Sequence, residues 1–352
     1  MNLVPQPDAV DGSVVDFGVL SSWMDEQGLP GGPFADVAPL SGGTQNVMLS
    51  FRRGGRSYVL RRPPVHLRRK SNDALVREMR VLAALADTPV PAPAYIAGCA
   101  DPAPLGGAVF YLMELVDGFN PSVALPSPHR DDPAVRHAMG LNAAAAIAAL
   151  GAVDHAAVGL GDIGHPDGFL ERQVRRWLSE LETYAELPGY PGPDIPGVDR
   201  VADWLERNRP TAWRPGLMHG DFHMANIMFR HDGPEVAAII DWEMTTVGDP
   251  LLDLGWMLAT RPDPDDGTIA RTSPLAAAGG FPSRTELVRA YGAASDRDLS
   301  SATWYEVLAC FKLGIVLEGS NARAAAGKAP REIGDRLHAH TLNLFDRALS
   351  LI

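Results

Sequence analysis

The stretch that decides the fold is His219–Asn226, which reads His-Gly-Asp-Phe-His-Met-Ala-Asn. Within it a carboxylate, Asp221, and a carboxamide, Asn226, are separated by four residues. A second acid, Asp241, ends the apolar run Val236–Ile240, and such a run predicts a buried strand. The Asp241 carboxylate is therefore expected to emerge at a strand end. We expect the three oxygen-bearing side chains to share one pocket.

The chemistry that this pattern favours is phosphoryl transfer. In protein kinases an Asp followed after four residues by an Asn supplies a base for the substrate hydroxyl and a ligand for Mg²⁺, and a second Asp completes the metal site. Few protein ligands are needed, because Mg²⁺ keeps water and phosphate oxygens around it. Each of these residue types alone is equally compatible with a turn or a helix N-cap. Their order, spacing and strand context together favour the catalytic interpretation.

Two downstream motifs extend the pattern, Ile-Asp-Trp-Glu at residues 240–243 and Gly-Asp-Pro-Leu-Leu-Asp at residues 248–253. In the second motif, Asp249 and Asp253 are expected to cap and buttress the following helix rather than bind metal. With His219–Asn226, these motifs resemble the aminoglycoside phosphotransferase family, kinase-like enzymes that phosphorylate hydroxyl groups of small molecules. The resemblance extends over nearly the whole chain beyond its leader. It implies an α+β, bilobal protein-kinase-like fold, with a small β-rich N-terminal lobe and a larger, mainly helical C-terminal lobe.

The resemblance also assigns roles at the centre of the site. It implies Asp221 as the catalytic base, Asn226 and Asp241 as Mg²⁺ ligands, and ATP and Mg²⁺ as cofactors. A metal site formed by His219 and His223 with Asp241 is the alternative, although a pocket for a hard cation prefers oxygen ligands.

Two further segments resemble one branch of this family. They are Gly-His-Pro-Asp-Gly-Phe-Leu-Glu-Arg-Gln-Val-Arg-Arg-Trp at residues 164–177 and Leu-Glu-Gly-Ser-Asn-Ala-Arg at residues 317–323. Both are similar to kinase-like domains that are fused to, or encoded beside, acyl-CoA dehydrogenases. The resemblance implies a functional link to an acyl-CoA dehydrogenase.

Length and composition set the broad class of the protein. A chain of 352 residues with 46% hydrophobic content can form two lobes. We place the nucleotide-binding lobe, with a leader segment, at residues 1–115. The lobe for catalysis and substrate binding is placed at residues 116–352. The net charge of −12 argues against a nucleic-acid partner. Cys99 and Cys310 are too few for a disulfide framework or a zinc cluster, which favours a reducing cytoplasm. We expect no signal peptide and no membrane segment, and both a monomer and a homodimer stay open.

The nucleotide-binding lobe is expected to contain a hairpin. Residues 47–52 and 57–62 predict two antiparallel strands, joined by a two-residue turn in Arg53-Gly54-Gly55-Arg56. The preceding loop carries Gly42-Gly43, where bare backbone N–H groups can face phosphate oxygens. Two glycines between strands are more often an ordinary turn, and no Gly-Lys-Ser/Thr of a Walker motif follows. The position ahead of the hairpin favours a phosphate-covering loop, with nucleotide contacts predicted at Ser41, Gly42, Gly43 and Thr44.

Kinase-like enzymes place a Lys on the returning strand to hold the α- and β-phosphates, whereas this strand carries Arg61 and Arg62. Side chains alternate across a strand, and the kinase cation shares a face with the residue two positions before it, so Arg61 is the predicted phosphate ligand. The alternative is that both arginines are solvated edge residues. Glu78 falls on the apolar stripe of a helix predicted from Ser71 to Ala86. It is expected to pair with Arg61, unless it reaches solvent past the stripe.

A strand predicted at residues 109–115 leads into a turn-rich link at 116–120, which we interpret as the hinge between the lobes. The backbone of Met113, Glu114 and Leu115 is expected to hydrogen-bond adenine. Beyond the hinge, apolar periodicity predicts helices at residues 132–150, 168–184, 198–209, 250–259, 283–293, 300–326 and 331–349.

The acceptor is predicted from charge. Aminoglycosides are polycations and require Asp and Glu, whereas a hydroxyacyl-CoA is a polyanion whose phosphates seek Arg and Lys. The segments expected to line the acceptor side contain more basic than acidic residues. The basic residues are Arg172, Arg175, Arg176, Lys312, Arg323 and Lys328, and the acidic ones are Glu171, Glu180, Glu182 and Glu318. The patch of three arginines is either a solvated face balanced by the glutamates or an anion site. The predicted substrate contacts are Arg172, Arg176, Glu243, Glu318 and Arg323.

Three functions follow from these observations. The leading one is an ATP-dependent phosphotransferase with an alcohol acceptor, preferably a hydroxyacyl-CoA or a related hydroxy metabolite. An aminoglycoside or other antibiotic phosphotransferase is the first alternative. A nucleotide-binding pseudokinase is the second, because Arg61 stands where Lys is expected.

Overall fold

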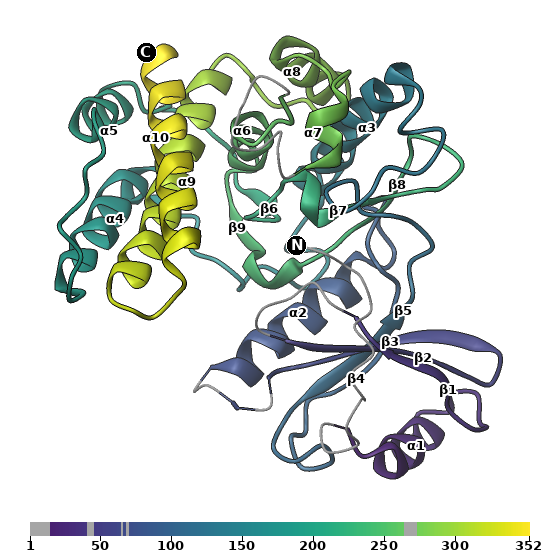
Figure 1. The fold of residues 1–352 in the computed structure, drawn as a ribbon. Helices are drawn as coiled ribbons and strands as arrows, with labels where there is room; N and C mark the ends of the chain where they lie inside the picture. The colour runs from purple at the N-terminus through teal and green to yellow at the C-terminus, as the bar shows by residue number, and fades with distance from the viewer. Residues whose placement is uncertain (1–14, 41–45, 65, 68–69, 264–272) are drawn as a thin grey trace.

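The computed structural model describes residues 15–40, 46–64, 66–67, 70–263 and 273–352. Within them the chain forms two lobes, a smaller one built around a β-sheet and a larger one that is mainly helical (Figure 1). The expected α+β, bilobal architecture is therefore confirmed.

The smaller lobe is a sheet with one helix on each face. Its elements are α1 (Phe17–Glu26), β1 (Ala35–Pro39), β2 (Val47–Arg53), β3 (Arg56–Arg62), α2 (Ser71–Leu85), β4 (Tyr95–Cys99) and β5 (Phe110–Glu114). The strands are antiparallel in the order β1-β2-β3-β5-β4. Alternation along β3 sends Val59 against α2 and sends Tyr58 and Leu60 against α1. The expected β2–β3 hairpin is present, and Gly54 and Gly55 in its turn have φ values of +57° and +79°, which other residues rarely adopt.

The larger lobe is arranged around α9. Its helices are α3 (Pro133–Gly151), α4 (Phe169–Thr183), α5 (Val198–Arg207), α6 (Leu251–Ala259), α7 (Pro274–Ala278), α8 (Arg284–Ala293), α9 (Ala302–Ala325) and α10 (Arg331–Ser350). α9 packs against α10, α6, α4 and α5. The sequence did not predict α7, because this helix is too short to show helical periodicity. In the part of the chain that the structure describes, no helix has the length and apolarity needed to cross a bilayer.

Two short ribbons position the candidate site. β6 (Gly216–Met218) pairs with β9 (Thr246–Gly248), and β7 (Ile227–Phe229) pairs with β8 (Val236–Ile239). The loop 219–226 runs from β6 to β7, and residues 240–245 run from β8 to β9. Each of the two segments is therefore anchored by a paired strand at both ends.

The lobes are joined by hydrogen bonds as well as by the chain. Phe119 and Phe229 exchange two backbone hydrogen bonds of 2.9 Å, which fasten the predicted hinge to β7. Arg77 on α2 donates to the backbone oxygens of Ile163 and Thr245 in the larger lobe. Arg77 therefore joins α2 to two segments of the larger lobe, one that precedes α4 and one that leads into β9.

Candidate active site

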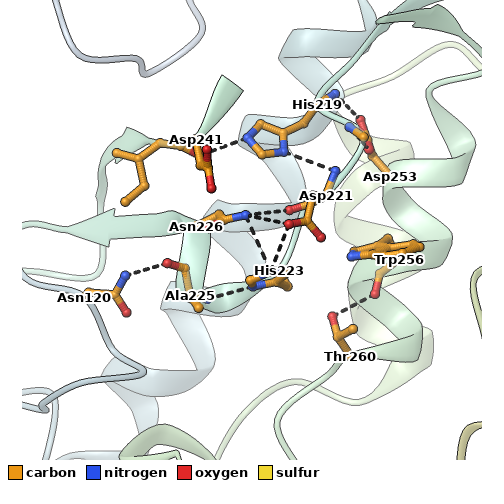
Figure 2. A network of polar contacts seen from close by, with 12 residues as sticks. Asn120, His219, Asp221, His223, Ala225, Asn226, Asp241, Asp253, Trp256 and Thr260 are labelled. Atoms are coloured by element: carbon orange, nitrogen blue, oxygen red, sulfur yellow. Dashed lines mark hydrogen bonds and ion pairs between the residues drawn. The ribbon is translucent and has the colours of Figure 1, made fainter. Parts of the chain in front are cut away.

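The side chains of the loop 219–226 hold one another in place (Figure 2). Asn226 Nδ2 donates to the backbone oxygen of Asp221 over 2.9 Å and to its Oδ2 over 3.2 Å. His223 Nε2 lies 3.4 Å from the same Oδ2. Burial alone would raise the pKa of Asp221, but the hydrogen bond and charge of His223 outweigh burial and hold this pKa at about 2. Asp221 is therefore an oriented, ionised carboxylate.

His219 connects this loop to the segment that carries Asp241. Its Nδ1 accepts a hydrogen bond from the backbone N–H of Asp221 over 3.3 Å. Its Nε2 lies 3.0 Å from the backbone oxygen of Ile240, so Nε2 carries the hydrogen and donates. Burial lowers the pKa of His219, which keeps the ring neutral. Both ring nitrogens are engaged by the backbone, so the position of His219 favours a structural role over the alternative of a histidine metal site.

Asp253 supports the loop from α6. Its Oδ2 accepts a hydrogen bond from His219 N over 2.6 Å, and its Oδ1 accepts one from Gly220 N over 2.8 Å. Gly220 has a φ of +87°, and a Cβ there would lie 2.5 Å from the backbone oxygen of Met244. Asp249 supports the start of α6 as expected, because its Oδ1 accepts a hydrogen bond from the backbone N–H of Leu251, the first residue of this helix. Asp253 holds the loop 219–226 instead of the helix, which corrects the role predicted for it.

We expect Asp253→Ala to lower the free energy of unfolding by about 3 kcal/mol, because it leaves two buried backbone N–H groups without acceptors. Urea unfolding followed by circular dichroism measures this change. Asp346→Ala, at an exposed position of α10, is the matched control and should change the value by less than about 0.5 kcal/mol. Equal effects of the two substitutions would contradict the supporting role of Asp253.

Arg61 connects the smaller lobe to the larger one through carboxylates. Its Nε lies 3.1 Å from Glu78 Oε2, its Nη2 lies 3.2 Å from Asp241 Oδ1, and Nη2 lies 3.8 Å from Glu243 Oε2. The expected contact between Arg61 and Glu78 is confirmed. Arg61 and Arg62 are both buried, so the alternative of two solvated arginines is wrong. Burial raises the pKa of Glu78 to about 7, and the positive charge of Arg61 opposes this shift.

Asp241 emerges at the end of β8, as the sequence predicts. Its φ of +68° is uncommon for a residue with a side chain and turns the carboxylate out of the strand direction. The backbone N–H of the preceding Ile240 donates to the backbone oxygen of Asn226 over 2.9 Å. This bond holds Asn226 beside Asp241, and in Figure 2 the Asn226 side chain lies between Asp241 and the side chains of Asp221 and His223. Carboxylate and carboxamide oxygens in this arrangement suit a hard cation.

The structure describes only some of the residues that are predicted to contact the nucleotide. Ser41, Gly42, Gly43 and Thr44 lie outside the described residues. In the hinge, Met113 is buried and Leu115 is exposed. The backbone N–H of Glu114 donates to Ala94 O over 2.9 Å, so this one group is engaged within the smaller lobe. Adenine contacts from the backbone of Met113, Glu114 and Leu115 stay a prediction.

A cavity of about 830 Å³ lies between α2 and α4. Arg172, Arg175 and Arg176 line it, in agreement with the basic patch predicted on this helix. Glu243 does not line it and lies beside Arg61 instead. Arg323 is exposed on α9, where it donates to Ser320 Oγ, and it does not line the cavity either.

Glu318 is completely buried, which disagrees with the substrate contact predicted for it. Its Oε1 accepts hydrogen bonds from the Tyr190 hydroxyl over 2.7 Å and from Asn321 Nδ2 over 2.9 Å. Its Oε2 lies 2.7 Å from His338 Nδ1. Glu318 therefore belongs to the polar contacts that hold α9 against α10.

Lys312 on α9 was counted in the sequence only as one of the acceptor-side cations. Its Nζ lies 4.5 Å from the centre of the Trp256 ring and 5.5 Å from that of Trp177. Burial lowers the pKa of Lys312 to about 8, while the charges of Asp253 and Asp221 oppose this shift. In the sequence, Lys312 appears only as a single cation within an otherwise apolar run. Such a run does not indicate which face of the helix carries the cation.

Comparison with solved structures supports the fold. A candidate aminoglycoside phosphotransferase from Ralstonia eutropha is 29% identical, and the match covers 95% of this chain and 98% of that one with a TM-score of 0.76. A thermostable aminoglycoside phosphotransferase in a ternary complex with ADP and hygromycin B has the same fold. Its TM-score is 0.58, at 15% identity, over 93% of this chain and 97% of that one.

Sequence comparison assigns the family. Acyl-CoA dehydrogenase family member 10 of Mus musculus is 29% identical over 297 residues, which are 82% of this chain. The chain matches 26% of that protein, so it spans about a quarter of the length of this relative. Residues 36–296 match the phosphotransferase enzyme family, and this range contains strands of the smaller lobe, the loop 219–226 and Asp241. Because the match extends over most of its length, the chain belongs to the phosphotransferase enzyme family.

Proposed function

We propose that the chain is an ATP- and Mg²⁺-dependent O-phosphotransferase that transfers the γ-phosphoryl group of ATP to an alcohol hydroxyl of a small molecule. The observation that carries this proposal is the convergence of Asp221, Asn226 and Asp241 between the two anchored segments (Figure 2). An oriented carboxylate beside two oxygen ligands supplies the parts that phosphoryl transfer requires of a protein.

Asp221 is the proposed catalytic base. As the hydroxyl oxygen of the acceptor attacks the γ-phosphorus, its proton passes to Asp221, the bond to the β,γ-bridging oxygen breaks, and ADP leaves. The low pKa of Asp221 keeps it ionised before the transfer. Asn226 and His223 orient the carboxylate, so little rearrangement is needed when the acceptor binds.

Asn226 and Asp241 are the residues that would hold Mg²⁺. Asn226 directs Nδ2 toward Asp221, and no donor among the described residues reaches its Oδ1, which is therefore available to a cation. Arg61 contacts Oδ1 of Asp241, which leaves Oδ2 for the metal. These oxygen donors fit a cation that keeps several water and phosphate ligands. When bound, Mg²⁺ neutralises charge between the β- and γ-phosphates.

Arg61 is proposed to hold the α- and β-phosphates in place of the usual Lys. We expect Arg61→Ala to lower kcat/KM for ATP by about 10- to 100-fold, because it removes a buried cation from the nucleotide side of the site. Arg61→Lys should retain most of the activity, since an ammonium keeps the charge on the same strand face. Arg56→Ala, at an exposed position of β3, is the control for kinetics and for the unfolding midpoint. Unchanged ATP kinetics in Arg61→Ala would remove Arg61 from nucleotide binding.

The proposed acceptor is a hydroxyacyl-CoA or a related acidic hydroxy metabolite. The arginines that line the cavity between α2 and α4 support it, because they suit phosphate groups better than ammonium groups. The similarity to acyl-CoA dehydrogenase family member 10 supports it as well, and with it a functional link to an acyl-CoA dehydrogenase. An aminoglycoside or another antibiotic is the second candidate, favoured by the similarity to the candidate aminoglycoside phosphotransferase from Ralstonia eutropha.

Labelled phosphate transfer from ATP decides between these acceptors. The purified chain is incubated with 4-hydroxyacyl-CoAs in one series and with kanamycin-type aminoglycosides in another. Transfer to the acyl-CoAs alone supports the preferred acceptor, and transfer to kanamycin alone overturns it. Binding of Mg²⁺-ATP without transfer to either class would indicate the pseudokinase that Arg61 suggests.

A further inference from the structure

The cavity between α2 and α4 is built by both lobes. Arg77 and Arg80 reach it from α2, residues 162–165 and Thr246 come from the larger lobe, and α4 supplies the remaining wall. Its volume of about 830 Å³ is within the range of sites that enclose a ligand of nucleotide size. It is therefore large enough for a ligand other than water or a single ion.

The charge of the cavity is positive in a chain whose net charge is −12. The ionised side chains that line it are Arg77, Arg80, Arg172, Arg175 and Arg176, against Asp162 and Glu180. In the described residues, neither Arg175 nor Arg176 forms an ion pair with Glu180 or Glu182. The excess of positive charge is therefore directed at the cavity and its opening.

Two of the five arginines that line the cavity have hydrogen-bond donors available to a ligand, and the other three are held by bonds within the protein. Arg77 and Arg172 donate to backbone oxygens, and Arg80 pairs with Asp162 over 2.6 Å. Arg175 and Arg176 are exposed, and neither has a hydrogen-bond acceptor among the residues that the structure describes. Arg176 lies 5.4 Å from the centre of the Trp177 ring, which orients its guanidinium without using its N–H donors.

Arg77 offers a further donor at the boundary of the two lobes. Its Nη2 bonds to Ile163 O and Thr245 O, but its Nε is buried and has no hydrogen-bond partner in the described chain. A buried donor without an acceptor is costly, and a ligand oxygen would satisfy it. The same helix carries Glu78, which contacts Arg61 on the nucleotide side.

Lys312 on α9 lies next to α4 but is not among the residues that line the cavity. The charges that act on its ammonium are those of Asp253, Asp221 and Arg176. Trp177 and Trp256 both lie against it. The Lys312 ammonium is therefore packed against two aromatic rings, and the arginines of the cavity remain the cations that face it.

We propose that this cavity is a second anion site, which binds a phosphate-bearing group through Arg175 and Arg176 with Arg77 and Arg80 at its lobe boundary. The group is the phosphate-bearing end of the acceptor or a separate phosphorylated metabolite. In the first case the inference rests on the proposed function, and in the second it is independent of it. Arginine forks suit both cases, because they bind phosphate oxygens in pairs.

Calorimetry with inorganic pyrophosphate and with coenzyme A tests the site directly. The protein is first saturated with Mg²⁺ and a non-hydrolysable ATP analogue, so that the nucleotide site is filled. Both probes are expected to bind, and Arg175→Gln/Arg176→Gln should weaken their binding at least about tenfold, because removing a single charge-assisted hydrogen bond can cost that much affinity. The control is Arg289→Gln/Arg336→Gln, which removes two exposed arginines from α8 and α10 and should leave binding unchanged.

Steady-state kinetics of the same double variant distinguish the phosphate-bearing end of the acceptor from a separate phosphorylated metabolite. If the site holds the acceptor, Arg175→Gln/Arg176→Gln raises KM for a 4-hydroxyacyl-CoA at least about tenfold while KM for ATP stays constant. If it holds a separate metabolite, pyrophosphate binding weakens and the acceptor kinetics stay constant. No pyrophosphate binding to the parent protein, or equal binding to the double variant, overturns the proposal. Pyrophosphate binding does not require turnover. A failure of the proposed phosphotransferase activity is therefore distinguishable from a failure of this anion site.

Discussion

Replacing Asp221 with asparagine is expected to lower turnover at least about a hundredfold, while Mg²⁺-nucleotide affinity stays within about threefold of the parent value. An amide cannot accept the proton of the acceptor hydroxyl. The bond from Asn226 Nδ2 to the backbone oxygen of residue 221 does not depend on the side chain, so the loop should keep its shape. Asp221 is therefore expected to contribute to the chemical step and not to nucleotide binding.

Steady-state kinetics with the best acceptor give the loss of turnover, and calorimetry with a non-hydrolysable ATP analogue gives the affinity. Asp346→Asn, at an exposed position of α10, controls for the loss of one negative charge. Unchanged turnover in Asp221→Asn would remove Asp221 from the mechanism. A parallel loss of nucleotide affinity would show that Asp221 acts through the metal site instead.

Asp241→Asn is expected to weaken the binding of Mg²⁺-ATP at least about tenfold, because a carboxylate is a much stronger ligand for Mg²⁺ than a carboxamide. The effect should depend on the metal. In the presence of a chelator the variant should bind ATP as well as the parent protein or better, since the substitution removes a negative charge near the phosphates.

Calorimetry with and without Mg²⁺ measures both affinities. Arg61 loses the partner that lies 3.2 Å from its Nη2, so the unfolding midpoint is recorded alongside to detect a change in stability. Equal Mg²⁺-ATP affinities in the parent and the variant would contradict the assignment of Asp241 as a metal ligand. An equal loss with and without Mg²⁺ would indicate that Asp241 acts by positioning Arg61.

The contacts that could be predicted from the sequence are those that follow from local periodicity. Alternation along β3 places Arg61 on the face of Val59, and helical spacing places Glu78 on the face of α2 that covers this side of the sheet. Two local rules therefore predicted a contact between elements that are adjacent in the chain. The glycine turn of the β2–β3 hairpin followed in the same way, because its φ values depend on its own two residues.

Local rules failed where a side chain finds its partner in a distant segment. The spacing of the motif that ends at Asp253 indicated a helix cap, but its carboxylate bonds to His219 and Gly220, more than thirty positions earlier in the chain. Glu318 lies in a motif that resembles the acyl-CoA-dehydrogenase-associated branch, yet tertiary packing buries it between α9 and α10. A polar residue in a helix can cap, pair or contact substrate, and the sequence does not distinguish these roles.

The sequence by itself determined the family, the two lobes and the order Asp221, Asn226, Asp241, because spacing along one chain is sufficient to specify them. The tertiary structure alone decided the cavity. Arg77 and Arg176 are about a hundred residues apart, and they line one space because docking of the two lobes brings α2 against the segment next to α4. The electrostatic field of such a site depends on distances in space, which no pattern of residues along the chain contains.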